Sequence, residues 1–179
     1  MLFRSPKEMD AKKVGDTQLE VELKLPADAP RGTNAFVVVS PDGGSEPHSL
    51  LVLEPGSLVS EKEPNNGFRQ AQEISFGKTI QGVINEAKEV DVFRITGQAG
   101  QTIVAEVSAA RFGSMLDSIL TLYDERGHVL ATNDDSETGS DSLLRVKLPA
   151  SGNYFLSLID AHDRGGVTFV YQLAVTVEK

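Results

Sequence analysis

The sequence predicts an all-β protein, in which residues 58–179 form an antiparallel β-sandwich of about eight strands and residues 1–57 form a smaller β-module. Apolar and polar residues alternate along most of the chain, which is the period of a strand with one buried face. Turn-forming residues separate the alternating runs at short intervals, as at 97–100, 150–152 and 163–166. Regular short strands joined by tight turns are typical of a sandwich.

The strands of the sandwich follow from this alternation. The longest run predicts a strand over residues 167–177, with the odd-numbered side chains from Val167 to Val177 buried. Three shorter runs have the same pattern, and their expected core residues are Ile103, Ala105 and Val107; Leu144, Val146 and Leu148; and Tyr154, Leu156 and Leu158. Residues 66–74 alone have helical spacing, with Phe68, Ala71 and Ile74 on one side and Asn65 or Asn66 as the N-cap.

The first part of the chain has fewer predicted strands, and proline- and glycine-rich turns separate them. Residues 18–25, 34–40 and 49–53 read as three strands separated by proline- and glycine-rich turns. Three strands rarely bury enough surface to be stable alone. We therefore expect an Ig-like β-module whose opening strands are short or missing, which leans on the sandwich and ends near residues 54–57.

Composition excludes several classes of function. The net charge of −9 argues against nucleic acid as a partner, because phosphates require a basic face. The sequence has no cysteine, which excludes disulfides, a thiol nucleophile and thiolate zinc sites. No apolar run approaches the length of a membrane helix, so we expect no membrane insertion. The first residues lack the apolar stretch of a signal peptide, which indicates that any export signal lies upstream of a cut inside a longer protein.

The segment 60–67 carries the strongest functional signal. It places two carboxylates, Glu61 and Glu63, and two amides, Asn65 and Asn66, around Pro64. Calcium takes six to eight oxygen ligands from groups of this kind. The alternative is an acidic linker that ends in a helix cap, since Ser60 and Glu63 also fit the S-x-x-E pattern. Pro64 weakens that alternative, because it would follow where a helix should be running.

Two other features have competing interpretations. A second group of oxygen-bearing residues either forms another cation site or is a solvated hairpin loop, and its members are Asn133, Asp134, Asp135, Glu137 and Asp141, with Asp117. Catalysis is not expected, because the three histidines lie in separate contexts and no G-x-S-x-G or H-E-x-x-H motif is present.

The order of several short motifs resembles that of bacterial pre-peptidase C-terminal domains. Glu61 to Asn66 is similar to the E-x-E-P-N-[ND] opening of that family. The later motifs follow in the family's order: Gly82-Val83-Ile84, Asp91-Val92-Phe93, Ala99-Gly100-Gln101, Leu116-Asp117, Leu120 to Asp124 with Gly127, Asn133-Asp134-Asp135, Gly152-Asn153-Tyr154 and Tyr171-Gln172-Leu173. The resemblance covers roughly residues 58–179, and residues 1–57 are similar to the Ig-like repeats that precede such domains.

The resemblance implies a jelly-roll-like sandwich that binds Ca²⁺. The collagen-binding segments of bacterial collagenases belong to this family and hold Ca²⁺ at the E-x-E-P-N linker and a D-x-D-x-[FY] strand. The matching positions here are Glu61, Glu63, Asn65, Asn66 and Asp91. The chain departs from the pattern before Asp91, where Glu89 replaces the first aspartate with a longer side chain or one ion of a two-ion site is lost.

Two functional hypotheses follow. The first is a non-catalytic, Ca²⁺-stabilised accessory domain of an exported bacterial protein, secreted or on the cell surface, that aids stability, domain orientation or adhesion. The second is a carbohydrate- or protein-binding module with its ligand site in a loop cluster. The expected partners are the neighbouring domains of the parent protein and an extracellular matrix protein or polysaccharide.

Overall fold

The described part of the chain is built almost entirely from strands. The computed structural model describes residues 2–3, 21–22, 24–26, 28–41, 43–137 and 139–178. Among these residues the helical structure is one 3₁₀ turn, η1 (Ala110–Phe112). No helix in this part of the chain is long and apolar enough to cross a membrane. The predicted all-β fold class is confirmed.

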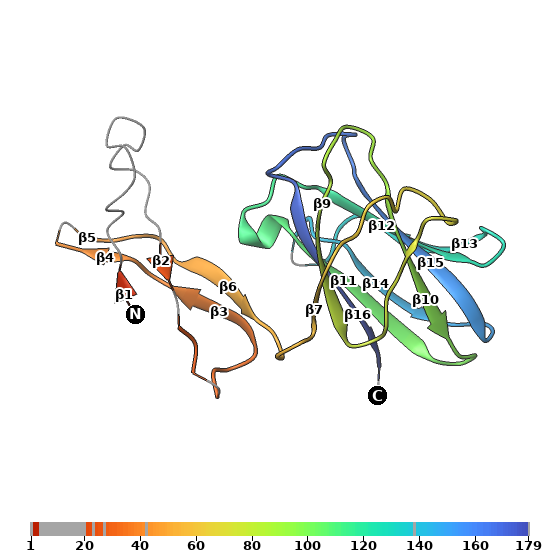
Figure 1. Cartoon of the computed structure of the whole chain (residues 1–179), viewed down its shortest axis with the longest axis horizontal. Helices are drawn as coiled ribbons and strands as arrows, with labels where there is room; N and C mark the ends of the chain where they lie inside the picture. Colours follow the sequence, from red (N-terminus) through yellow and green to blue (C-terminus); the bar gives the residue numbers. More distant parts are fainter. Residues whose placement is uncertain are drawn as a thin grey trace.

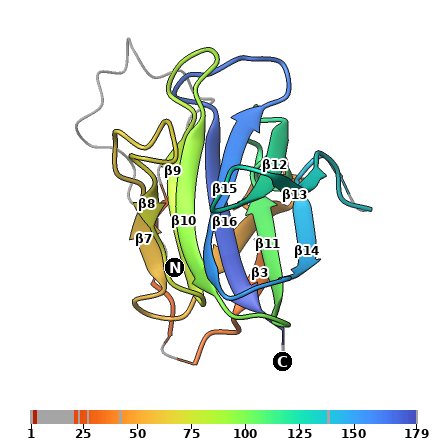
Figure 2. The ribbon, with the colours of Figure 1, turned by 90° about the vertical axis from the view of Figure 1, so that its right-hand side faces the viewer.

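Two five-stranded sheets face each other and form the sandwich (Figures 1 and 2). One sheet has the order β13 (Val129–Asn133), β12 (Ser118–Asp124), β15 (Gly152–Asp160), β10 (Asp91–Gly97) and β8 (Gln72–Glu73). The other has the order β14 (Leu143–Lys147), β11 (Thr102–Ser108), β16 (Val170–Val177), β9 (Lys78–Val83) and β7 (Leu58–Ser60).

The core lies between the sheets and is made from alternate residues of each strand. Ile103, Ala105 and Val107 of β11 are fully buried, as their alternation predicted. Leu156 and Leu158 of β15 face them from the other sheet and are also fully buried. Each large aliphatic side chain removed from water in this way contributes about 1.5–3 kcal/mol to folding. The interleaved side chains therefore fix the register of both sheets.

The register predicted for the last strand is confirmed over its central residues. Phe169, Tyr171, Leu173 and Val175 are all buried. The prediction is wrong at Val167, which is 90% exposed. A turn precedes the strand, in which the Phe169 N–H donates to the Gly166 carbonyl at 2.9 Å, so the strand begins only at Val170.

The linker adds a strand to one edge of each sheet. Strand β7 pairs with β9 and strand β8 pairs with β10, and both pairs are parallel. The expectation of a wholly antiparallel sandwich is therefore wrong at these two edges. The predicted helix over residues 66–74 is also wrong, because Phe68 stacks on Phe155 at a centroid distance of 4.5 Å while Ile74 enters the core.

The strands before residue 57 form two-stranded sheets. Strands β3 (Gly32–Phe36) and β6 (His48–Val52) pair antiparallel, as do β4 (Val39–Ser40) and β5 (Gly43–Gly44). A third pair joins β1 (Leu2–Phe3) and β2 (Val21–Glu22), and the rest of the predicted strand at 18–25 lies largely outside the described residues. These sheets share no strand with the sandwich, and the boundary at residue 57 and the Ig-like assignment stay predictions.

Candidate metal centre

The candidate site forms where the linker reaches the sandwich. Glu61 directly follows β7, and its N–H donates to the Gln81 carbonyl at 2.9 Å, so the linker stays against β9. Asp91 is the first residue of β10. The Val92 N–H donates to the Asn65 carbonyl at 2.9 Å and ties the linker to the start of β10. Two backbone contacts thus bring the acidic linker next to Asp91.

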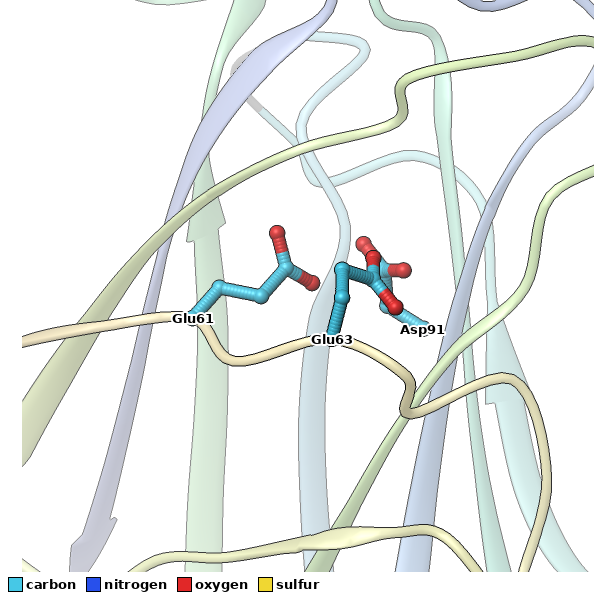
Figure 3. A group of neighbouring side chains, drawn as sticks. All are labelled: Glu61, Glu63 and Asp91. Atoms are coloured by element: carbon cyan, nitrogen blue, oxygen red, sulfur yellow. The ribbon is translucent and has the colours of Figure 1, made fainter.

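Three carboxylates converge at this point (Figure 3). One oxygen from each of Glu61, Glu63 and Asp91 lies within 4.8 Å of the others. Glu61 is half-buried, Glu63 is exposed and Asp91 is fully buried. Three like charges this close repel one another strongly unless a proton or a cation lies among them.

A tyrosine hydroxyl bridges two of the carboxylates. The Tyr171 hydroxyl lies 2.7 Å from Glu61 Oε1 and 2.7 Å from Asp91 Oδ2. It has one proton to donate, so a proton on one of the two carboxyl groups is needed to complete both bonds. Glu61 is further fixed by the Val83 N–H, which donates to its Oε2 at 3.0 Å, and by Asn65 Nδ2, which donates to its Oε1 at 2.9 Å.

The electrostatics agree with a protonated Asp91 when no cation is present. Burial, together with the hydrogen bond and the charge of Glu61, raises the pKa of Asp91 to about 9. Burial also raises the pKa of Glu63, and the charges of Glu61 and Glu89 act in the same direction against a bond from the Asn65 N–H. Negative charge is therefore in excess at this site.

Two buried oxygen atoms at the site lack a partner. Among the described residues, Asn65 Oδ1 and Asp91 Oδ1 are buried and accept no hydrogen bond. Asn65 and Asp91 are each 0% exposed. Buried acceptors without a donor are rare in folded proteins and call for an unseen ion or water. Both atoms belong to residues that the sequence had suggested as cation ligands.

The other two predicted ligands have different roles. Asn66 is exposed, and its Oδ1 accepts a bond from the Asn65 N–H at 3.2 Å. Glu89 is 8% exposed, and its Oε2 accepts from the Asn85 and Glu86 N–H groups. The structure thus brings together Glu61, Glu63, Asn65 and Asp91 and places Glu89 and Asn66 beside them.

Two site residues were missed as such in the sequence. Tyr171 was expected only as a buried side chain of the last strand, and its bridging role depends on partners far away in the chain. Gly82 is also essential to the site, because a Cβ there would lie 2.4 Å from the Tyr171 hydroxyl and 2.5 Å from Glu61 Oε2. In the sequence, Gly82 was singled out only as the first residue of the Gly82-Val83-Ile84 motif.

The second oxygen cluster is held by protein groups. Asp141 Oδ1 accepts from the Ala109 and Ala110 N–H groups at 3.1 and 2.7 Å, and Asp141 Oδ2 lies 2.6 Å from Arg111 Nε. Asn133 Oδ1 accepts from the Leu143 N–H at 2.7 Å. Asp141 thus binds the backbone N–H groups at the start of η1, and among the described residues this cluster supplies no group of three ligand carboxylates. A second ion site at Asn133, Asp134, Asp135 and Asp141 stays a prediction.

The histidines of the sandwich lie in separate exposed loops. His128 Nδ1 is 2.9 Å from Asp124 Oδ2, and His162 Nδ1 is 3.4 Å from Asp117 Oδ2. Asp160 is a separate buried carboxylate that forms an ion pair with Arg164, whose Nε lies 3.0 Å from Asp160 Oδ2. Although burial acts in the opposite direction, hydrogen bonds from Arg164 and from the backbone N–H groups of Asp117 and His162 lower the pKa of Asp160 to about 2.

Part of the sandwich is similar in sequence to known proteins. Residues 89–159 match the family described as the bacterial pre-peptidase C-terminal domain. The matched range includes Asp91 and excludes the linker residues Glu61 and Glu63. A probable subtilase-type serine protease of Deinococcus radiodurans is 43% identical over 115 residues, which is 60% of this chain. The aligned region spans only 16% of that relative's length.

Two solved structures are similar to this chain over its sandwich. The pre-peptidase C-terminal domain of a Bacillus anthracis collagenase is 18% identical, with a TM-score of 0.46 over 59% of this chain and 94% of that domain. A periplasmic inhibitor of g-type lysozyme from Aeromonas hydrophila is 16% identical, with a TM-score of 0.46 over 60% of this chain and 97% of the inhibitor. Residues 89–159 of the sandwich thus match the bacterial pre-peptidase C-terminal domain family, and the rest of the chain lies outside that match.

Proposed function

We propose that this chain is a non-catalytic accessory domain in which one Ca²⁺ ion holds the linker against the sandwich. The ligands are the carboxylates of Glu61, Glu63 and Asp91 and the amide oxygen of Asn65. The observation that carries the proposal is the pairing of three carboxylates within 4.8 Å with two buried oxygens that accept no hydrogen bond among the described residues.

The chemistry of the donor set favours a hard cation. All four groups offer oxygen, the cluster contains no histidine, and the chain contains no cysteine. Soft transition metals prefer nitrogen and sulfur ligands, whereas Ca²⁺ takes carboxylate and amide oxygens in irregular arrangements. Mg²⁺ demands near-octahedral geometry and keeps several waters, so a protein-rich oxygen set such as this one favours Ca²⁺.

The ion would replace the proton that Asp91 holds in its absence. Bound Ca²⁺ supplies two positive charges that offset the repulsion among the carboxylates. Asp91 then ionises, and the Tyr171 hydroxyl donates to one carboxylate and orients it. Binding is therefore coupled to proton release and becomes stronger as pH rises.

The position of the site suggests what the ion does for the protein. Glu61 and Glu63 lie in the only covalent connection between residues 1–57 and the sandwich, and Asp91 lies in the sandwich itself. An ion shared by these residues fastens the linker and fixes the direction in which the first part of the chain leaves the sandwich. The partner of the site is thus the neighbouring part of the same protein.

The parent protein is proposed to be exported. The 43% identical relative carries the name of a subtilase-type protease, and the aligned region is a small share of that protein. We place this chain in the same role, as an accessory to a larger secreted or cell-surface protein. Binding of a matrix protein or polysaccharide stays a prediction.

One observation favours the alternative role in ligand binding. Phe68, Tyr123 and Phe155 form an aromatic cluster on the outer side of the sheet, with Phe68 38% exposed and 5.2 Å from Tyr123 between ring centroids. Aromatic faces are common anchors for partners. Saturable binding to a polysaccharide that survives EDTA and is lost in Phe68→Ala would establish this second role.

Thermal unfolding tests the metal proposal. The wild-type chain should melt at a higher temperature in excess Ca²⁺ than in EDTA, because a ligand that binds only the folded state stabilises it by about 2.7 kcal/mol at one hundred times Kd. Asp91→Asn should lose this difference while keeping its stability in EDTA, where Asp91 is already neutral. A wild-type melting temperature that is the same in both conditions would overturn the proposal.

A further inference from the structure

We propose that Asn66 deamidates spontaneously and that the carboxylate so formed strengthens cation binding at the Glu61, Glu63 and Asp91 cluster. Asn66-Gly67 is the only Asn-Gly pair in the 179-residue sequence. The modification is argued from this pair and from the contacts of Asn65, Asn66 and Gly67. Its effect on affinity rests on the proposed function.

The nucleophile for this reaction is the Gly67 backbone nitrogen. Deamidation requires that nitrogen to reach the side-chain carbon of the preceding asparagine, which demands backbone freedom that glycine provides. A Cβ added to Gly67 would meet no atom within 4 Å, so the space on that side of the glycine is free, although the Gly67 carbonyl accepts a bond from the Gln70 N–H at 2.9 Å. No hydrogen bond described for this chain is donated by the Gly67 N–H. The nitrogen is therefore available for attack.

The electrophile is activated by a neighbouring amide. The Asn65 N–H donates to Asn66 Oδ1 at 3.2 Å and also to Glu63 Oε2 at 3.0 Å. When the Gly67 nitrogen attacks the Asn66 side-chain carbon, negative charge develops on Oδ1. A donor already aimed at that oxygen stabilises the charge, as backbone N–H groups do in acyl-transfer sites.

The reaction balances with water as its only co-reactant. The Gly67 nitrogen loses its proton and bonds to the Asn66 side-chain carbon, and the bond from that carbon to the amide nitrogen breaks. The amide nitrogen takes up that proton, through water, and leaves as ammonia, and a five-membered succinimide remains. Water then opens one of the two ring C–N bonds and yields aspartate or isoaspartate. No atom is oxidised or reduced.

The new carboxylate lies close to the metal cluster. Both hydrogen bonds from the Asn65 N–H meet at one nitrogen, so Asn66 Oδ1 lies within about 6 Å of Glu63 Oε2. An added negative charge at this distance attracts a divalent cation enough, even with the dielectric constant of water, to tighten binding about tenfold. Deamidation thus makes the site a stronger calcium site with time.

Peptide mapping tests the modification. The purified full chain is kept in EDTA at mildly alkaline pH and body temperature for several days, then digested and analysed by mass spectrometry. We expect a gain of about 1 Da in the peptide that contains Asn66. The peptides of Asn85 and Asn153, which precede Glu86 and Tyr154, should stay unchanged. Gly67→Ala should slow the gain at least tenfold, because the added methyl group restricts the backbone.

Retention of the Asn66 amide after this treatment would overturn the proposal. Gain of the same mass at the same rate in Gly67→Ala would also overturn it, because the glycine would then have no role.

Calorimetric titration with CaCl₂ tests the effect on affinity. Asn66→Asp should bind Ca²⁺ with a Kd about tenfold lower than that of the wild type. Asn153→Asp adds the same charge next to Thr96, at the other end of β10 from Asp91, and should leave Kd unchanged. An equal Kd for Asn66→Asp and the wild type would overturn the effect on affinity. A wild type that binds no Ca²⁺ yet deamidates at Asn66 would overturn the proposed function and leave the modification standing.

Discussion

Glu63→Gln should lower the stability of the fold in calcium and leave it unchanged or slightly higher in chelator. The substitution removes one negative charge and keeps the shape of the side chain. The new amide oxygen can still accept the bond that the Asn65 N–H donates to Glu63 Oε2 at 3.0 Å. Any change that depends on Ca²⁺ therefore reports on the charge rather than on a lost hydrogen bond.

The expected size of the effect follows from linkage. At a free Ca²⁺ concentration of one hundred times Kd, the ion stabilises the wild type by about 2.7 kcal/mol. If loss of one charged ligand weakens binding one hundredfold, the same concentration stabilises Glu63→Gln by only about 0.4 kcal/mol. The difference of about 2.3 kcal/mol corresponds to a melting temperature lower by roughly 8–10 °C for a domain of this size.

In EDTA the destabilising effect of Glu63→Gln should be absent or change to a slight stabilisation. Burial and the charges of Glu61 and Glu89 raise the pKa of Glu63, so its ionised form is unfavourable in the folded chain without a cation. A neutral amide removes that repulsion, and Glu63→Gln should unfold at the wild-type temperature or slightly above it.

Differential scanning calorimetry with Ca²⁺ and with EDTA measures the melting temperatures of Glu63→Gln and the wild type. Glu125→Gln is the matched control, because Glu125 is an exposed glutamate in the turn after β12 and makes no ion pair described for this chain. It should leave both melting temperatures unchanged. An equal loss of stability for Glu63→Gln with and without Ca²⁺ would refute the reasoning and assign Glu63 a purely structural role.

Three further predictions concern pH and backbone space. In EDTA the melting temperature should fall as pH rises from about 5 to about 9. The reason is that folded Asp91, with its pKa near 9, keeps a proton that the unfolded chain has already released. A melting temperature that rises over this pH range would contradict the prediction. The low pKa of Asp160, about 2, stabilises the fold above its ordinary pKa of 3.8 and this stabilisation is lost as pH falls toward 2. Asp160→Asn should therefore cost about 2 kcal/mol at neutral pH and nearly nothing at pH 2 in denaturant titrations, and an equal cost at both pH values would contradict it. Gly82→Ala should cost about 1–3 kcal/mol and weaken Ca²⁺ binding, because its Cβ would lie 2.4 Å from the Tyr171 hydroxyl, whereas Gly67→Ala should change neither; an unaltered Gly82→Ala would contradict the packing argument.

The features that sequence could predict are local ones. The alternation that buried Phe169 to Val175 depends only on the two-residue period of a strand. The candidate ligands Glu61, Glu63 and Asn65 lie within a few residues of one another, so their oxygens are gathered by the chain itself. Asp91 entered the predicted ligand set only through the resemblance to the family's ordered motifs. The structure brings Glu61, Glu63 and Asp91 together, and their binding of an ion stays a prediction.

The features that sequence could not predict depend on distant partners. The helix expected at 66–74 does not form because Phe68 packs on Phe155 and residues 72–73 pair with β10, and both partners lie far along the chain. Val167 alternates correctly but precedes the strand, since a turn closed by the Gly166 carbonyl intervenes. The bridging hydroxyl of Tyr171 likewise requires three segments to meet, which no local pattern encodes.

Isothermal titration calorimetry of the wild-type chain with Ca²⁺ tests the central claim most directly. Our account predicts saturable binding of one ion per chain. It also predicts that the measured heat near neutral pH depends on the ionisation enthalpy of the buffer, because Asp91 must release its proton when the ion binds. A titration without saturable heat in any buffer would contradict the calcium site, and binding with a buffer-independent heat would contradict the exchange of proton for cation at Asp91.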